Sequence, residues 1–306
     1  VALLLAITQG RRHGWDSTYI RSLFAIATVF FLAFLTIELT VERPFLDLGL
    51  YRNPRFVVTS IAAFLFESAF NSANFLVALL LQQVFQFTPF HAGLILAPGA
   101  VAMGVVGLGA GRLADLLDPR LPILLGLLLQ ATAMYCLGLT SLFTTSAWMM
   151  FLVVLYRMSF GCVHTPLTSI VLQSLPKGRL SMGSGLDGIH RGFASAFGIA
   201  IGSTVLELRT IAHLRGLGEQ HELSALSVRE AVREVAQLLA EAGEVGGTVS
   251  GKALAVIQAH MLRQAEMAAY QDTFLLLCAI TLLALLPAML SRETPEGFGK
   301  PSNGGN

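Results

Sequence analysis

The sequence predicts an all-α protein, a polytopic bundle of transmembrane helices, and three observations lead to that prediction. The 306 residues are 54% hydrophobic and only 13% charged, with a mean hydropathy of +0.68, whereas a soluble domain usually carries about 25% charged residues. The charged residues gather in clusters between long apolar stretches, and most of these stretches approach or exceed the roughly 20 residues that a helix needs to cross a bilayer. The net charge of +1 argues against a nucleic-acid partner.

Eight apolar segments follow one another, separated by loops in which prolines end the helices. In order they cover residues 1–8, 22–41, 56–85, 92–113, 121–143, 147–172, 182–206 and 273–290. The first is too short to cross a bilayer and is expected to be the end of a helix, which predicts that the chain is part of a longer protein. The other seven are expected to be complete spans.

Lysine and arginine predict the orientation, because short loops rich in them stay in the cytoplasm. One side of the predicted bundle collects Arg43, Arg52, Arg55, Arg112, Arg120, Lys177, Arg179, Arg292 and Lys300. The loops of the other side hold basic residues only near its start, at Arg11, Arg12 and Arg21. We therefore expect the residues 111–120 and the C-terminus to face the cytoplasm.

The remaining organisation is predicted from composition. Residues 1–55 are expected to hold the end of one helix and a linker helix, and residues 56–291 a six-helix half. The connection 209–271 is expected to lie outside with two amphipathic helices of its own, either as a packed cap or in contact with a partner or lipid headgroups. Residues 292–306, rich in Gly, Pro and Asn, are expected to form a disordered cytoplasmic tail.

Polar residues inside the apolar segments are the candidate functional residues, because an ionisable side chain in hydrocarbon costs roughly 2.5–3.5 kcal/mol and needs a partner or a water-filled cavity. Glu67, Asn71 and Asn74 are spaced four and three residues apart, which places them on one helix face. They form either the wall of a cavity, with Glu67 binding a proton or a cationic substrate, or a set of interhelical hydrogen bonds.

Two later segments carry further candidates. Arg157 and His164 share one face of segment 147–172; a carboxylate is a plausible partner for Arg157, and His164 could exchange protons near neutral pH or simply pack. Asp187 precedes Arg191 by four residues, the favourable order for an ion pair on a helix. In the same segment the pairs Gly188/Gly192 and Gly198/Gly202 have the spacing that lets helices approach closely.

The chain shows no spacing of nucleophile and base and no metal-binding pattern, so it is not predicted to be an enzyme. Cys136, Cys162 and Cys278 each stand alone in an apolar segment, as small packing residues do.

The stretch from Gly111 to Arg120 resembles the G-x-L-x-D signature of the major facilitator superfamily, with Gly111, Leu113, Asp115 and Arg120 matching and Leu116 in place of the usual basic residue. The order of other pieces is similar to the fourteen-helix drug:proton antiporters of the EmrB/QacA type. Those pieces are Gln9-Gly10, Gly14-Trp15, Glu38, the run 42–48, Asn53, Phe56, the stretch 157–166 and Arg191-Gly192.

This resemblance implies the C-terminal portion of a major facilitator fold in the inner (plasma) membrane. The whole protein would be a multidrug efflux transporter that confers drug resistance, using the proton gradient and no cofactor, by alternating access. Asp115 would belong to a cytoplasmic gate, and Glu67, Asn71 and Asn74 would line the cavity. The partners implied are the bilayer, a small amphipathic substrate, the N-terminal half of the same protein and a possible periplasmic adaptor.

Two alternatives stay open at this point. One is an exporter of the same fold that carries a siderophore or an endogenous metabolite. The other is a membrane scaffold or sensor that transports nothing, against which the intramembrane carboxylate of Glu67 argues, because a scaffold does not need it.

Overall fold

The computed structural model describes residues 16–40, 54–116, 120–173, 180–222, 232–237 and 249–290, with a few isolated positions before residue 16. Over these residues the chain forms helices and turns without strands, which confirms the predicted all-α class. The long helices are α2 (Thr18–Thr40), α3 (Pro54–Gln83), α4 (Pro89–Leu116), α5 (Arg120–Gly138), α6 (Ser146–Gln173), α7 (Leu180–Glu222) and α9 (Val249–Leu290).

Six of these helices, α3 to α7 and α9, are long and apolar enough to cross a membrane, while the apolar part of α2 covers Thr18–Phe34. The predicted segment 1–8 and the tail 292–306 lie largely or wholly outside the described residues.

Polar side chains mark where several helices begin. The Ser17 hydroxyl accepts a hydrogen bond from the amide of Ile20 at 3.2 Å, and the Thr145 hydroxyl accepts one from Trp148 at 3.4 Å, at the starts of α2 and α6. Helix α4 begins at Pro89, whose missing N–H is harmless in the first turn. These caps satisfy backbone donors that a helix leaves unpaired at its N-terminus.

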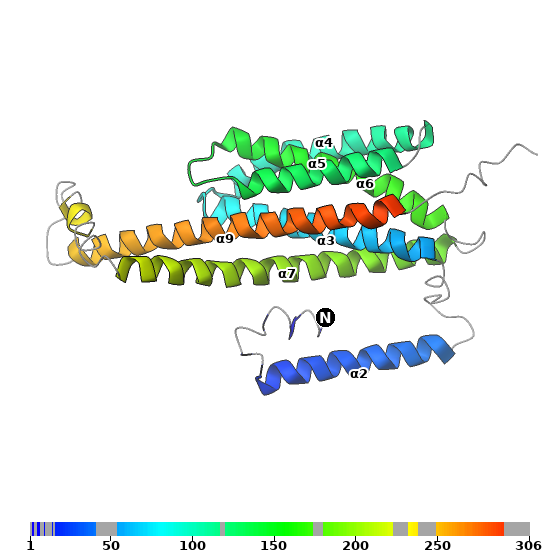
Figure 1. Ribbon diagram of the computed structural model, residues 1–306, viewed down its shortest axis with the longest axis horizontal. Helices are drawn as coiled ribbons and strands as arrows, with labels where there is room; N and C mark the ends of the chain where they lie inside the picture. Colours follow the sequence, from blue (N-terminus) through cyan, green and yellow to red (C-terminus); the bar gives the residue numbers. More distant parts are fainter. Residues whose placement is uncertain are drawn as a thin grey trace, which may run out of the picture.

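The six long membrane helices form one bundle, whereas α2 lies apart from it (Figure 1) and makes no packing contact with any other helix in the described part of the chain. Helix α6 packs between α4 and α5, and α9 packs against α3, α5 and α7. Helix α3 contacts α6, α7 and α9.

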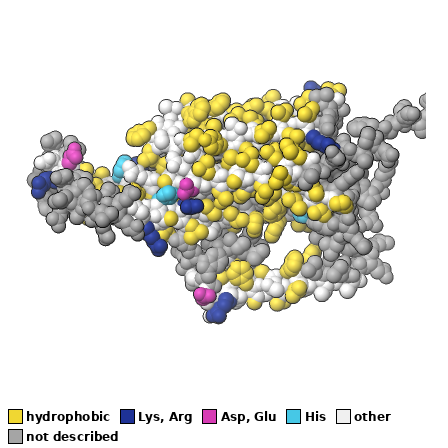
Figure 2. Space-filling model, in the orientation of Figure 1, with side chains coloured by type: hydrophobic (Ala, Val, Ile, Leu, Met, Phe, Trp, Pro, Cys, Tyr) yellow, Lys and Arg dark blue, Asp and Glu magenta, His cyan; other side chains and the backbone are white. Residues whose placement is uncertain are grey.

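The core lies where α3, α5, α6 and α9 meet, around fully buried side chains such as Leu76, Met134, Tyr156 and Phe274. Exposed apolar side chains cover the outside instead, for example Leu286, which is 59% exposed on α9. Figure 2 shows one broad hydrophobic face, with the charged side chains mostly toward its ends. Such an exterior suits contact with the lipid bilayer.

Helices α7 and α9 continue into the predicted connection 209–271, as far as Glu222 and from Val249 onward. They are 43 and 42 residues long, about 64 Å each at 1.5 Å per residue, and extend past the other helices at one end of the bundle (Figure 1). The charged residues at which the predicted spans end hold the extended parts of α7 and α9 together. Asp272 Oδ2 on α9 lies 2.8 Å from His213 Nε2 and 3.7 Å from Arg209 Nε on α7.

Candidate functional site

Four polar side chains from three helices form a continuous chain of contacts inside the bundle. On α3, Asn71 Nδ2 donates to Glu67 Oε2 at 3.1 Å and to the Glu67 carbonyl oxygen at 2.8 Å. From α6, His164 Nδ1 lies 3.1 Å from Glu67 Oε1, and from α7, Arg191 Nη1 lies 2.9 Å from His164 Nε2. The Glu67 side chain is only 8% exposed and that of His164 29%. We call these four residues the carboxylate–imidazole cluster.

The contacts determine where the His164 ring carries its hydrogen. A guanidinium can only donate, so Nε2, facing Arg191 Nη1 at 2.9 Å, must accept. The hydrogen of a neutral ring then sits on Nδ1, which donates to Glu67 Oε1. A doubly protonated ring would set an N–H against the N–H of Arg191. In this tautomer, Glu67 Oε1 is the acceptor for the hydrogen on His164 Nδ1.

Aromatic rings support His164 from one side. The imidazole stacks on Phe160, with centroids 4.5 Å apart and planes 14° apart. Phe160 in turn contacts Phe70 of α3 at 4.4 Å. Because the ring is packed in this way, its two nitrogens are held toward α3 and α7.

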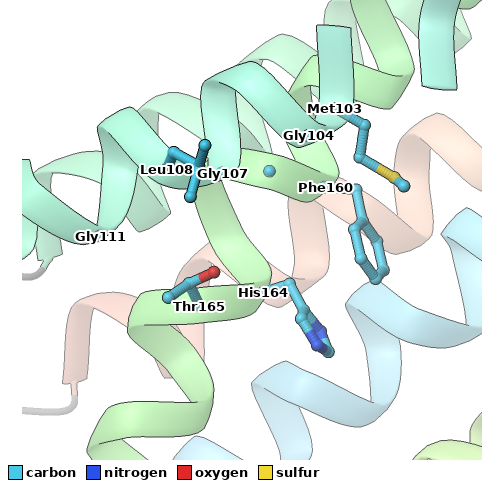
Figure 3. Close-up of a pocket in the computed structure, with 9 residues that line it drawn as sticks. Met103, Gly104, Gly107, Leu108, Gly111, Phe160, His164 and Thr165 are labelled. Carbon is cyan, nitrogen blue, oxygen red and sulfur yellow. The ribbon is translucent and has the colours of Figure 1, made fainter. Parts of the chain in front are cut away.

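A cavity of about 410 Å³ opens beside this stack, between α4 and α6. It is lined by Met103, Gly104, Gly107, Leu108, Gly111, Phe160, Gly161, His164 and Thr165. Figure 3 shows Phe160 and His164 projecting from α6 toward α3, next to the glycine-rich stretch of α4. The lining is mostly apolar, which suits a lipophilic ligand.

Glycine determines how closely α4 and α6 approach. A Cβ added at Gly161 would lie 2.6 Å from the Met103 carbonyl oxygen and 2.8 Å from the Gly107 nitrogen. Both neighbours are backbone atoms, so a larger residue would force the helices apart. The close crossing thus requires glycine at Gly161, whereas an added Cβ at Gly107 would meet Gly161 Cα only at 3.7 Å, an ordinary contact, and Gly104 and Gly109 face open space.

The close approach predicted from small-residue spacing in α7 is confirmed for one pair only. Gly198 lies against the backbone of Ser68, and Gly202 against the side chain of Ser72, so α7 and α3 touch closely there. Gly188 and Gly192 have no atom within 4 Å of an added Cβ.

A hollow of about 10 Å³, room for about one water molecule, lies between α3 and α7. It is lined by Ser60, Ala63, Phe64, Glu67, His190, Arg191 and Ala194.

A second polar group surrounds Arg157 on α6. Its Nη2 donates to Asn74 Oδ1 at 2.6 Å, and the Tyr156 hydroxyl donates to the same oxygen at 3.3 Å. Within the described residues no carboxylate lies within 4.0 Å of the guanidinium, so an amide stands where the sequence suggests an acidic partner. Asn74 therefore lies on the same face of α3 as Glu67 and Asn71 but belongs to the polar group around Arg157 and not to the carboxylate–imidazole cluster.

The other candidate residues lie elsewhere or outside the described atoms. Gly111 and Leu113 are on α4, which continues through Leu116, and Arg120 begins α5, so the predicted loop motif is largely helical. The side chains of Asp115 and Asp187 lie outside the described residues, and the Asp187–Arg191 ion pair stays a prediction.

Sequence reasoning missed two sets of side-chain contacts between the helices of the bundle. The first is the Phe160 stack, since a phenylalanine in an apolar segment carries no signal. The second is a buried network in which Ser159 Oγ donates to Gln130 Oε1 at 3.1 Å and Gln130 Nε2 donates to Thr281 Oγ1 at 3.3 Å. The glutamine, isolated in an apolar helix, was the available clue. In the described part of the chain, no three His, Cys, Asp or Glu side chains group as metal ligands would.

Comparison with known proteins agrees with this architecture. The chain is 28% identical over 223 residues to multidrug export protein EmrB of Escherichia coli, which covers 71% of the chain and 43% of that protein. It is 24% identical to lincomycin resistance protein LmrB of Listeria innocua, over 74% of the chain and 48% of that protein, and 28% identical to multidrug resistance protein Stp of Mycobacterium tuberculosis, over 67% and 38%. The matched part of the chain spans less than half the length of each of these relatives.

The family model of the Major Facilitator Superfamily matches residues 2–199. That match covers more than half of the 306 residues, and the described chain is a bundle of long apolar helices. The chain is thus a multi-pass membrane protein, and it belongs to the major facilitator superfamily.

Proposed function

We propose that the protein containing this chain is a proton-driven secondary transporter that exports amphipathic drugs or other small toxic molecules by alternating access. The relatives named for multidrug export and lincomycin resistance support the drug-efflux part. The observation that carries the proposal is the carboxylate–imidazole cluster: a carboxylate, 8% exposed, sits in a membrane helix and contacts His164 of α6, which in turn contacts Arg191 of α7.

Within that cluster the Glu67 carboxylate is the group to exchange a proton. The His164 lone pair at Nε2 is already occupied by Arg191, so an incoming proton is accepted by a carboxylate oxygen. Protonation removes the negative charge that receives the His164 Nδ1 hydrogen at 3.1 Å, and charge-assisted hydrogen bonds are roughly twice as strong as neutral ones. The link between α3 and α6 weakens as a result, which is how a proton would bias the helix arrangement.

The other proposed parts follow from the fold of the family. The cavity of about 410 Å³ beside His164 takes the apolar body of a substrate, and the rest of the protein supplies the opposite wall. The residues Gly111, Leu113, Asp115 and Arg120 form a gate at the cytoplasmic end. The C-terminus lies in the cytoplasm, the protein lies in the inner membrane, and a periplasmic adaptor is a possible partner.

Efflux from proteoliposomes tests the proposal. The intact protein is reconstituted, tetramethylrhodamine methyl ester is loaded as a cationic amphipathic dye, and a pH gradient is imposed. Wild-type protein should move the dye faster with the gradient than without it, and Glu67→Gln should lose that difference while inserting normally. Glu207→Gln makes the same charge change at an exposed position of α7 and should behave as wild type.

Two results count against the proposal. Gradient-driven efflux that persists unchanged in Glu67→Gln removes the proton role of Glu67. Wild-type protein that moves no dye with or without a gradient, in vesicles shown to contain it, removes drug efflux itself. Competition by siderophores or cell metabolites in the same assay separates the export of drugs from that of endogenous compounds.

A further inference from the structure

Arg157 holds a positive charge at the middle of a membrane span. It lies eleven residues after Ser146 and twelve before Ser169, the ends of the α6 span. A charge at this depth needs a compensating partner. Its partners within the described residues are neutral: the Asn74 amide oxygen at 2.6 Å and the Tyr156 ring, whose centroid is 5.9 Å from Arg157 Cζ. The Nε atom is buried and has no hydrogen-bond partner.

Among the residues that the structure describes, Glu67 is the one buried carboxylate, and it forms no ion pair with Arg157. Glu67 receives hydrogen bonds from Asn71 and His164, and Arg191 lies at the other end of the same imidazole. The carboxylate–imidazole cluster therefore balances one negative charge with one positive charge. Within the described ranges, no carboxylate lies within 4.0 Å of Arg157.

Three helices hold the guanidinium in place. Asn74 of α3 accepts its hydrogen bond, and the Tyr156 hydroxyl fixes the orientation of that amide by donating to the same oxygen at 3.3 Å. Gly99 of α4 leaves room for the side chain, because a Cβ there would lie 2.6 Å from Arg157 Cδ. A guanidinium positioned in advance loses little conformational freedom when it binds an anion, and its planar donor set matches a carboxylate.

The cavity begins one helical turn along α6 from the backbone position of Arg157. Gly161, four residues after Arg157 and on the same helix face, lines it together with Phe160 and Met103. An amphipathic molecule with its apolar body in this cavity places a polar end within reach of Arg157.

From these observations we infer that Arg157 binds an anionic group of the transported molecule, so that amphipathic compounds bearing a carboxylate are recognised here. The inference rests on the proposed transport function and names a substrate class for the same cavity. Asn74, Tyr156 and Gly99 are positioning residues, which act by holding the guanidinium.

A pair of dyes that differ only at one carboxyl group tests it. Tetramethylrhodamine carries a free carboxylate, and its methyl ester does not. Their binding to the intact protein in lipid nanodiscs is measured by fluorescence anisotropy. Wild-type protein should bind the acid more tightly than the ester. Arg157→Gln should weaken acid binding by about tenfold to a hundredfold, the range for losing hydrogen bonds to a charged group, and should not weaken binding of the ester, because the cationic ester loses a neighbour of like charge.

Three variants separate ligand binding from a structural role. Arg157→Lys keeps the charge and should retain part of the preference for the acid. Gly99→Ala keeps the arginine but displaces its side chain, and should reduce that preference. Arg209→Gln removes an arginine whose side chain is 57% exposed on the α7 extension and should change neither affinity. Thermal unfolding of each variant shows that it is folded.

The outcomes divide as follows. Equal weakening of both dyes in Arg157→Gln, or an acid affinity that this substitution leaves unchanged, overturns the inference; the second result would mean that Arg157 pairs with a carboxylate of the protein itself. Wild-type protein without a preference for the acid also overturns it. If the ester is still exported in response to a pH gradient, the proposed transport function stands even when this inference fails.

Discussion

The crossing of α4 and α6 predicts a sharp effect of one methyl group. In Gly161→Ala the new Cβ would lie 2.6 Å from the Met103 carbonyl oxygen, whereas favourable non-bonded contacts begin at roughly 3.5 Å, so the helices must separate by about 0.9 Å. The Gly107 nitrogen, 2.8 Å away, opposes the same methyl group. Because both obstacles are backbone, no side-chain rotation relieves them.

Overpacking of this kind costs about 1–3 kcal/mol, while replacing glycine by alanine within a helix gains up to about 1 kcal/mol. We expect a net loss of roughly 1–2 kcal/mol in Gly161→Ala. Gly109→Ala in α4 is the matched control, because its Cβ meets no atom within 4 Å, and it should be neutral or slightly stabilising.

Thermal unfolding of the purified variants in one detergent measures both effects. The midpoint of Gly161→Ala should fall by several degrees below that of Gly109→Ala. Equal midpoints for the two variants would show that α4 and α6 do not cross through these glycines, and the description of the cavity between them would have to be abandoned.

Two further predictions concern α7. Gly198→Ala should destabilise the protein by about 1–3 kcal/mol, because an added Cβ would meet the backbone of Ser68 on α3, whereas Gly188→Ala, which faces open space, should not; equal unfolding midpoints would contradict the contact. Arg191→Met should release the Nε2 atom of His164, so the ¹⁵N spectrum of the imidazole, a single tautomer protonated at Nδ1 in the wild type, should show a mixture in the variant. A wild-type ring protonated at Nε2 would refute the assignment.

The sequence predicts the helices and their faces well, because a bilayer allows little besides long apolar helices. Glu67 and Asn71 share a face by spacing alone, and the structure joins them by a hydrogen bond at 3.1 Å. The contacts of these residues with His164 and Arg191 could not be predicted, since periodicity describes one helix and says nothing of how neighbouring helices are rotated or shifted along one another.

Identical patterns also led to different results. The spacing of Gly198/Gly202 equals that of Gly188/Gly192, yet only the first pair faces a neighbouring helix. The charges after residue 208 predict the end of a helix, but α7 continues to Glu222 because a helix needs apolar residues only while it crosses lipid. In each case the outcome depends on what surrounds that part of the helix in the folded protein, and a single sequence does not show those surroundings.

The charges of Glu67 and Arg157 lead to a last prediction. Asn74, which accepts the hydrogen bond from the Arg157 guanidinium, lies seven residues after Glu67 on α3, about 10 Å along the helix. Charges at that distance interact by about 1.7 kcal/mol at an effective dielectric constant near 20, somewhat more than tenfold in affinity. Neutralising Glu67 makes the wall more positive, so Glu67→Gln should strengthen binding of tetramethylrhodamine acid and weaken binding of its cationic methyl ester. A proton on Glu67 would then act in opposite directions on anionic and cationic substrates. If the substitution shifts both affinities in the same direction, Glu67 and Arg157 do not share one electrostatic environment, and the wall does not act as a single binding surface.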